Sequence, residues 1–205
     1  MKKVFLIASI LFVAVASTAC INNLAVQDLN NKAQVFMEKG DYTQAIERLK
    51  SSIDLDPSIF ETHYNLAVAY TKAEDYVNAV EEYKKAIKIK PNVADAYYSL
   101  ATAENNLAID MEQGNVRMND VDGSLYSQKA DENETSEKVK LTDKEKELVA
   151  ELYDSAVKNY EKYLELNPNA KDKKDVEDLI KQIQEPQDRK STRLNSSHHD
   201  ISYAV

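Results

Sequence analysis

The chain has 205 residues, a formal net charge of −9 at pH 7 and 30% charged residues. Such a negative charge argues against binding nucleic acid through its phosphates, and it fits either simple solubility or a basic partner. The absence of tryptophan, only three glycines and many alanine, lysine, glutamate and tyrosine residues indicate an all-α chain. The length is enough for one domain with a buried core.

Residues 1–19 have the form of a secretory signal peptide. A short basic start precedes an apolar run over residues 4–16, which is too short to span a bilayer as a stable anchor. Cys20, the only cysteine, follows directly, and a lone thiol cannot staple an exported fold. The segment resembles a bacterial lipoprotein signal, which implies lipidation of Cys20 after cleavage and a tether over residues 20–26. Ser17 departs from the aliphatic residue usual three places before the cysteine, so ordinary signal-peptidase cleavage nearby is the alternative.

Residues 40–91 hold two copies of one pattern, 34 residues apart. In each copy a small residue is followed by leucine or tyrosine, a second small residue and a proline. These are Ala45, Leu49, Ser52 and Pro57 in the first copy and Ala79, Tyr83, Ala86 and Pro91 in the second. Small residues suit the close crossing of two helices, and proline stops the second helix of each pair. The pattern resembles the tetratricopeptide repeat, which implies a solenoid of antiparallel helix pairs.

A third repeat is interrupted by an insertion. Its first helix is expected over residues 94–111. The residues that match its second helix, Ala156, Tyr160 and Pro168, come 77 residues after their counterparts in the second repeat, so 43 residues have been inserted. Residues 142–145 have capping-box form, which should start this second helix early and make it long.

The insertion at residues 113–140 is rich in Asp, Glu, Asn, Ser and Lys and poor in large apolar residues. This composition predicts a mobile loop or a segment ordered by a partner. Residues 120–123 resemble part of a calcium-binding loop. In a complete loop the first and last ligand positions would be Met118 and Lys129, whose side chains offer no oxygen ligand. We therefore expect a solvated loop and no metal site.

Residues 171–184 are expected to close the array. Val176, Leu179, Ile180 and Ile183 fall on one helical face, as suits a terminal helix that covers the end of a stacked core. The expected fold is therefore an all-α tetratricopeptide-repeat solenoid of about three helix pairs plus a C-terminal capping helix, over residues 27–184.

The C-terminal residues 188–205 resemble the translation of a sequencing adapter with its index. We expect this tail to be non-native and exclude it from the fold. Whether the native chain continues beyond Gln187 stays open.

The sequence shows no catalytic constellation. It has no phosphate-binding glycine loop and no cysteine–histidine cluster, and His63 is expected to pack at the start of a helix and not to act as a base. We predict a protein that is not an enzyme and that uses no cofactor, metal or small-molecule substrate.

The resemblance implies a groove, lined by the first helices of the repeats, that binds a partner protein or peptide. Carried over by repeat register, its lining residues are Asn30, Gln34, Met37, Tyr64, Val68, Thr71, Tyr98, Thr102 and Asn105. Tyr64 and Tyr98 would offer aromatic anchors to the partner, or else they cover neighbouring helices. Some members of the family clamp a C-terminal carboxylate with a basic residue, but Asn30 and Tyr64 occupy the places where it would stand. We do not expect that clamp.

These observations together predict an exported lipoprotein, anchored in the membrane of a bacterial periplasm or cell surface, that acts as a protein-binding scaffold. Two alternatives stay open. The chain could be an assembly or secretion accessory for an envelope complex, or the N-terminal part of a longer enzyme.

Overall fold

The computed structural model describes residues 23–128 and 140–185. The predicted signal peptide, Cys20 and the predicted adapter-derived tail lie outside these ranges, as do residues 129–139 of the insertion.

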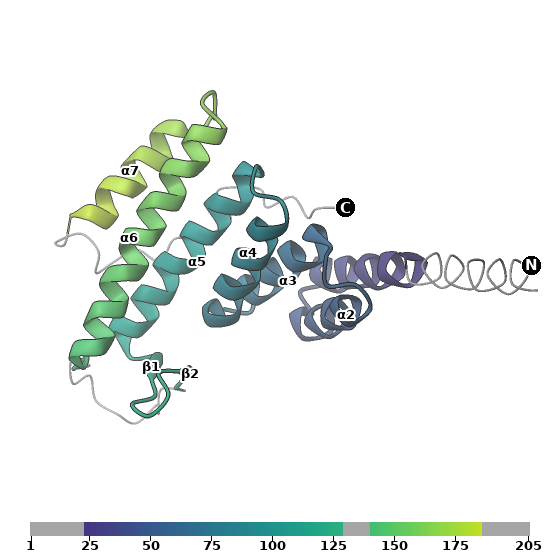
Figure 1. Cartoon of the computed structure of the whole chain (residues 1–205), viewed down its shortest axis with the longest axis horizontal. Coiled ribbons are helices and arrows are strands. Elements are labelled where there is room, and N and C mark those ends of the chain that lie inside the picture. Colours follow the sequence, from purple (N-terminus) through teal and green to yellow (C-terminus); the bar gives the residue numbers. More distant parts are fainter. Residues whose placement is uncertain (1–22, 129–139, 186–205) are drawn as a thin grey trace, which may run out of the picture.

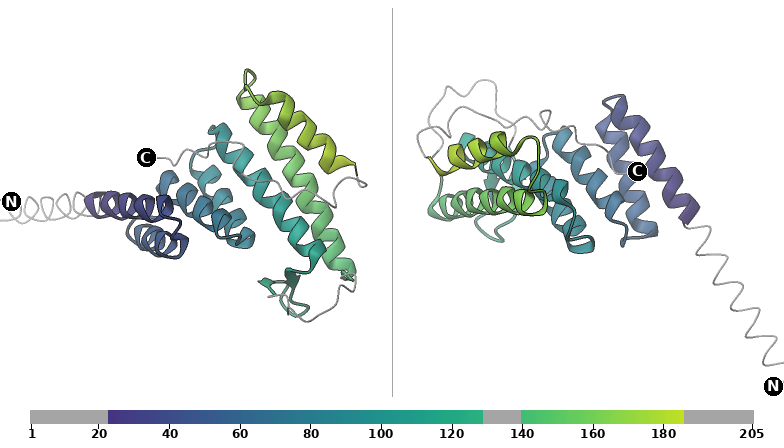
Figure 2. Two further views of the ribbon diagram at one scale, coloured as in Figure 1. Left: turned by 180° about the vertical axis from the view of Figure 1, so that it is seen from behind. Right: turned by 90° about the horizontal axis from the view of Figure 1, so that it is seen from above.

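The described part of the chain is a series of helices with one small hairpin (Figure 1). Residues 23–38 are helical and are called the N-terminal helix below. The elements that follow are α2 (Tyr42–Leu55), α3 (Phe60–Lys72), α4 (Tyr76–Ile89), α5 (Ala94–Gln113), β1 (Val116–Met118), β2 (Leu125–Ser127), α6 (Asp143–Leu166) and α7 (Lys173–Gln184). Each helix from α2 onward packs against the next one along the chain, and Figure 2 shows this succession from two further sides. The predicted all-α solenoid is confirmed.

The two repeats start their second helices in the same way. Asp41 and Asp75 cap α2 and α4, and each carboxylate accepts a hydrogen bond from the backbone N–H three residues ahead, at 3.1 and 3.2 Å. The residues before these caps, Gly40 and Glu74, both have a positive φ, 75° and 58°. A left-handed conformation suits glycine, whereas it strains a residue with a side chain such as Glu74. The 34-residue period therefore extends from the sequence to the backbone torsions.

Helix packing follows the predicted register. The small and large residues of the pattern are fully buried, and they are Ala45, Leu49, Ala79, Tyr83, Ala156 and Tyr160. Because Ala156 and Tyr160 lie on α6, which packs against α5, the third helix pair is the one predicted across the insertion. Thr142 caps α6 in a capping box with Glu145, also as predicted.

The insertion differs from its prediction in the part that the structure describes. Strands β1 and β2 form an antiparallel hairpin, with Arg117 opposite Tyr126, and Val116 is buried. Arg117 donates two hydrogen bonds to the Glu145 carboxylate, at 2.7 and 3.1 Å, and the backbone N–H of Met118 donates a third at 3.1 Å. These contacts hold the hairpin on the start of α6, so this part of the insertion is ordered by the array itself.

Helix α7 covers the end of the array. Val176 and Ile183 are buried against the core, and Leu179 and Ile180 are half-buried. The Tyr163 hydroxyl of α6 donates a hydrogen bond of 2.7 Å to Asp172, which precedes α7. The predicted capping helix is therefore present.

His63 links three parts of the fold. Its Nδ1 lies 2.6 Å from a carboxylate oxygen of Glu82 on α4, and its Nε2 lies 2.9 Å from the carbonyl oxygen of Pro57 in the loop before α3. Both neighbours are acceptors, so both ring nitrogens donate only when the ring is protonated. The hydrogen bond to Glu82 is the main cause that raises the pKa of His63, against the opposing effect of burial.

This linkage predicts a pH-dependent stability. A pKa that is higher in the folded state than in the unfolded state adds stability below pH 6.5, which is lost as the pH rises through the folded pKa. Urea unfolding should therefore give a smaller free energy of unfolding at pH 9 than at pH 6, and His63→Gln should flatten this difference. An identical pH profile in both proteins would contradict the charged pair. Lys85, which also bonds Glu82, is present in both.

Candidate functional site

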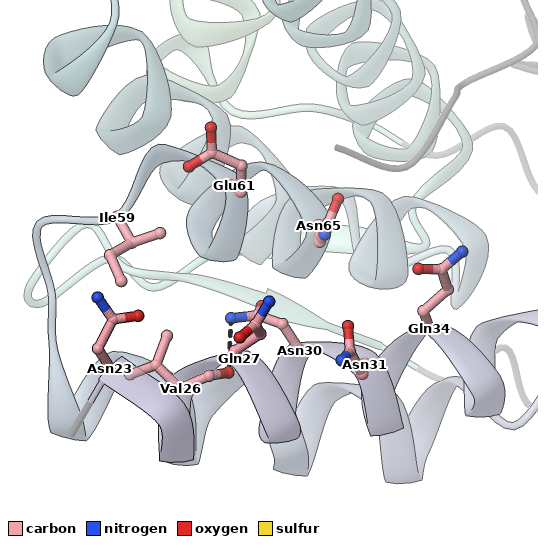
Figure 3. A pocket seen from close by; sticks show the side chains of 9 residues that line it. All are labelled: Asn23, Val26, Gln27, Asn30, Asn31, Gln34, Ile59, Glu61 and Asn65. Atoms are coloured by element: carbon pink, nitrogen blue, oxygen red, sulfur yellow. Dashed lines mark hydrogen bonds between the residues drawn. The ribbon is translucent and has the colours of Figure 1, made fainter. Parts of the chain in front are cut away.

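A cavity of about 280 Å³ opens between the N-terminal helix and α3. The N-terminal helix supplies one wall, and α3 with the residue before it supplies the other (Figure 3). The lining residues are Asn23, Val26, Gln27, Asn30, Asn31, Gln34, Ile59, Glu61 and Asn65. Asn30 and Gln34 belong to the predicted groove set, and the structure brings them together here.

Asn30 joins the N-terminal helix to the next two helices. Its Nδ2 lies 3.0 Å from the carbonyl oxygen of Val26, 3.1 Å from Ser52 Oγ and 3.0 Å from Thr62 Oγ1. The nitrogen has two hydrogens, so one N–H donates to the Val26 carbonyl oxygen and the other is shared between the two hydroxyl oxygens. Its Oδ1 is buried and has no hydrogen-bond partner within the described ranges. Leaving a buried acceptor without a hydrogen bond costs free energy, and a donor that reached this atom would remove that cost.

Tyr64 lies inside the helix packing. Its ring stacks on Phe60 at 5.6 Å between centroids and meets Tyr83 of α4 edge-on, also at 5.6 Å. The side chain is 4% exposed, burial raises the pKa of Tyr64 to about 12, and its hydroxyl lies 3.3 Å from Ser99 Oγ. These contacts favour the alternative in which Tyr64 covers neighbouring helices.

Tyr98 occupies the equivalent place one repeat later. Its ring meets Tyr160 and Tyr163 of α6 edge-on, with centroids 5.4 and 5.3 Å apart, and it is 6% exposed. Both aromatic residues of the predicted groove set therefore face the second helix of their own pair.

The other predicted lining residues are also buried and are not among those that line this cavity. They are Met37, Val68, Thr71, Thr102 and Asn105. Thr71 donates a hydrogen bond to the Tyr83 hydroxyl at 3.4 Å, and Thr102 lies 2.9 Å from the Tyr160 hydroxyl. Like the tyrosines, these threonines face the second helix of their pair.

The sequence-based prediction missed the other seven lining residues. Four of the seven form two pairs of repeat equivalents: Gln27 with Glu61, and Asn31 with Asn65, each 34 residues apart. Both Asn31 and Asn65 directly follow a residue of the predicted set, and one residue is a rotation of about 100° on a helix. The spacing of Gln27, Asn31 and Gln34 along one face is the signal that could have found this wall.

Glu61 is the one charged residue that lines the cavity within residues 23–128 and 140–185. It pairs with Lys90, whose ammonium also lies 5.2 Å from the centre of the Phe60 ring. Partial burial would raise the pKa of Glu61, but the Lys90 ammonium holds it below its ordinary value, so Glu61 is ionised at neutral pH. Among the residues that the structure describes, no lysine, arginine or histidine lines the cavity.

Within residues 23–128 and 140–185, no group of three or more histidine, cysteine, aspartate or glutamate residues could hold a metal ion. None of the helices in the same ranges is long and apolar enough to cross a membrane.

Comparison with known proteins adds two kinds of finding. The family model for TPR repeat matches residues 33–74, and that for tetratricopeptide repeat matches residues 60–93. No curated protein sequence matches the chain.

Several solved structures share the fold at low identity. The second TPR domain of human RPAP3, in complex with HSP70 peptide SGPTIEEVD, is 17% identical with a TM-score of 0.54; the match covers 80% of this chain and 98% of that one. The TPR2B domain of yeast Sti1, in its pHsp70 complex, is 15% identical with a TM-score of 0.53, over 78% and 97%. The Sgt2 TPR domain from Aspergillus fumigatus is 17% identical with a TM-score of 0.54, over 88% and 90%.

The fold thus defines a helical-repeat protein of stacked helix pairs. Residues 33–93 match tetratricopeptide-repeat family models, and the fold of the described chain is that of TPR domains.

Proposed function

We propose that this protein holds a segment of a partner protein in the cavity between the N-terminal helix and α3. The observation that carries the proposal is the cavity itself, which the first helices of two consecutive repeats enclose. In the similar RPAP3 and Sti1 domains, the same fold is found with HSP70 peptides. That likeness supports a peptide or protein partner and gives no identity for it.

We further propose that the groove is held at a bacterial envelope by lipid on Cys20. The support is the signal-like residues 1–19 and the single cysteine that follows them. The proposed place is the periplasm or the cell surface, with residues 20–26 as the tether. A lipid-tethered groove suits either a scaffold or an accessory that helps to assemble an envelope complex.

The tether is tested with Cys20→Ala. A single acyl chain binds membranes marginally and several chains bind them stably, so loss of the lipidated cysteine should move most of the mature protein into the soluble fraction. Cell fractionation with radiolabelled palmitate measures both the location and the lipid. As a control, Ser17→Leu restores the aliphatic residue of the lipoprotein signal and should leave lipidation intact. A Cys20→Ala protein that stays in the membrane after signal removal would refute the anchor.

Partner binding is tested by affinity isolation from solubilised envelope. Asn31→Arg/Asn65→Arg places two bulky cations in the cavity and should remove the partner that the wild-type protein retains. Thr43→Arg/Ser51→Arg adds the same charge to exposed positions of α2, which contributes nothing to the cavity, and should retain it. Equal retention by both variants would exclude this cavity as the binding site.

A further inference from the structure

The N-terminal helix forms one end of the array. In the right-hand view of Figure 2 it is the outermost helix on one side, and α6 and α7 lie at the other end. Its core-facing residues, Val26, Ala33 and Met37, are buried. A terminal repeat in a stacked array has one face that no further repeat covers. The opposite side of this helix is that face, and its residues in the described chain are exposed.

Four residues on the exposed side form one stripe, which we call the end stripe. Leu24, Asp28, Lys32 and Val35 fall within about 80° of the helix circumference, since each residue turns the helix by about 100°. Leu24 is 68% exposed and Val35 is 46% exposed. Between them, Lys32 Nζ lies 2.6 Å from a carboxylate oxygen of Asp28, and both charged side chains are more than half exposed. An apolar residue thus stands on each side of an exposed ion pair.

The end stripe is its own complement under a twofold rotation. The midpoint between Asp28 and Lys32 falls at residue 30, and that between Leu24 and Val35 falls between residues 29 and 30. Two copies of the helix packed antiparallel about this midpoint bring Asp28 of each copy opposite Lys32 of the other. Leu24 of each copy then lies opposite Val35 of the other, to within about 1.5 Å along the helix axis. The surface that best matches one end stripe is therefore a second one.

We propose that the end stripe is a homodimer interface in which the N-terminal helices of two copies pack antiparallel. Charges of alternating sign attract across this contact, apolar side chains leave water on both sides of them, and a twofold dimer uses the same patch on both subunits. None of the four residues lines the cavity, so the contact uses none of the cavity wall. A twofold axis normal to a membrane keeps both N-termini at its surface, which is compatible with the proposed lipid tether.

Charge reversal tests the contact in the full chain, by sedimentation in density-matched detergent over about 5–200 µM protein. The wild-type protein should pass from monomer to dimer in this range, because one helix from each copy makes a smaller contact than a standard stable interface. Asp28→Lys leaves only cations at the centre of both stripes and should weaken dimerisation about tenfold or more. The swap Asp28→Lys/Lys32→Asp restores the alternation and should return the dissociation constant to within about threefold of wild type. Glu81→Lys, the same change in charge at an exposed position of α4, should dimerise like wild type.

Disulfide cross-linking in membranes tests the register. Leu24→Cys/Val35→Cys should form a covalent dimer on mild oxidation, because each new thiol faces the other position of the second copy. Within one helix the two positions lie about 16 Å apart, too far for a disulfide. Neither single variant should cross-link, since the two copies of either position lie about 15 Å or more apart. The wild-type chain, whose only cysteine is Cys20, is the control for that thiol.

A chain that stays monomeric over the whole range and forms no cross-link would overturn the proposal. So would a dimer that Asp28→Lys leaves unchanged, or single cysteine variants that cross-link as readily as the pair, because both results place the contact on another face or in another register. Circular dichroism checks that each variant is folded. Should Asp28→Lys fail to fold, Lys32→Asp makes the same test with anions.

Discussion

Replacing Tyr83 by alanine should lower the free energy of unfolding by about 3–5 kcal/mol, the range for truncating a large buried aromatic residue. Tyr83 is fully buried on α4, meets the Tyr64 ring edge-on and accepts a hydrogen bond from Thr71. Its loss would leave a cavity at the centre of the second helix pair. Urea unfolding followed by circular dichroism measures the change.

The matched control for this variant is Tyr83→Phe, which keeps the ring and removes only the hydroxyl. It should cost about 1.5 kcal/mol or less. Equal costs for the two variants would contradict the role of ring packing. Tyr64→Ala belongs in the same series: because Tyr64 is 4% exposed and stacks on Phe60, we expect it to destabilise the fold as well. A melting temperature unchanged by Tyr64→Ala would restore Tyr64 as a free aromatic anchor.

Glu145→Ala should destabilise the protein by about 3 kcal/mol at neutral pH. The folded pKa of Glu145 is about 2, roughly two units below the ordinary value for glutamate, and each unit corresponds to about 1.4 kcal/mol. The bond from Arg117 is the main reason that the pKa of Glu145 falls to about 2, against the opposing effect of burial, and backbone N–H groups of Thr142 and Met118 assist. The variant removes both the capping box of α6 and the attachment of the hairpin.

The free-energy cost of Glu145→Ala should depend on pH. A carboxyl group with a lowered folded pKa adds stability above its unfolded pKa of about 4.3, and that stability is lost as the pH falls toward the folded value of about 2. The cost of Glu145→Ala should therefore shrink between pH 5 and pH 2. Glu147→Ala, an exposed carboxylate on the same helix, should leave stability nearly unchanged. A pH-independent cost would contradict the ionised contact.

The repeat pattern was enough to predict the fold because it reports on packing. Ala45 and Ala79 are small where helices cross, and Tyr83 and Tyr160 fill the space beside them, so each residue type is dictated by its place in the core. The same logic located the second helix of the third pair across a long insertion. Local capping chemistry at Thr142 gave the start of that helix.

The groove was harder to predict because several of its lining residues, such as Asn23, Gln27 and Asn31, are exposed polar residues whose type helix packing does not dictate. The predicted Tyr64 and Tyr98 are buried between helices, while Asn31 and Asn65, a fraction of a turn away, line the cavity. Repeat register alone fixes the helix on which a residue lies. It does not fix which of two adjacent residues turns toward the open side.

The buried positions of two acidic residues could not be predicted from the sequence. Glu104 is fully buried and accepts hydrogen bonds from Ser155 and Asn159 of α6, and Glu145 holds the hairpin. Their partners lie 28 to 55 residues away along the chain, and a local sequence pattern does not predict such pairs. The same long-range contact explains why a polar insertion is ordered next to α6.

Site-specific photo-crosslinking in cells of the source organism tests the central claim most directly. A benzophenone side chain at Asn31 or Asn65 would sit in the cavity, and the same side chain at Glu47 or Glu81 would sit on exposed positions of α2 and α4 that contribute nothing to its wall. We predict that one partner is captured from both cavity positions and from neither control position. Capture at Glu47 and Glu81 with none at Asn31 and Asn65 would place the partner elsewhere and contradict the proposed groove.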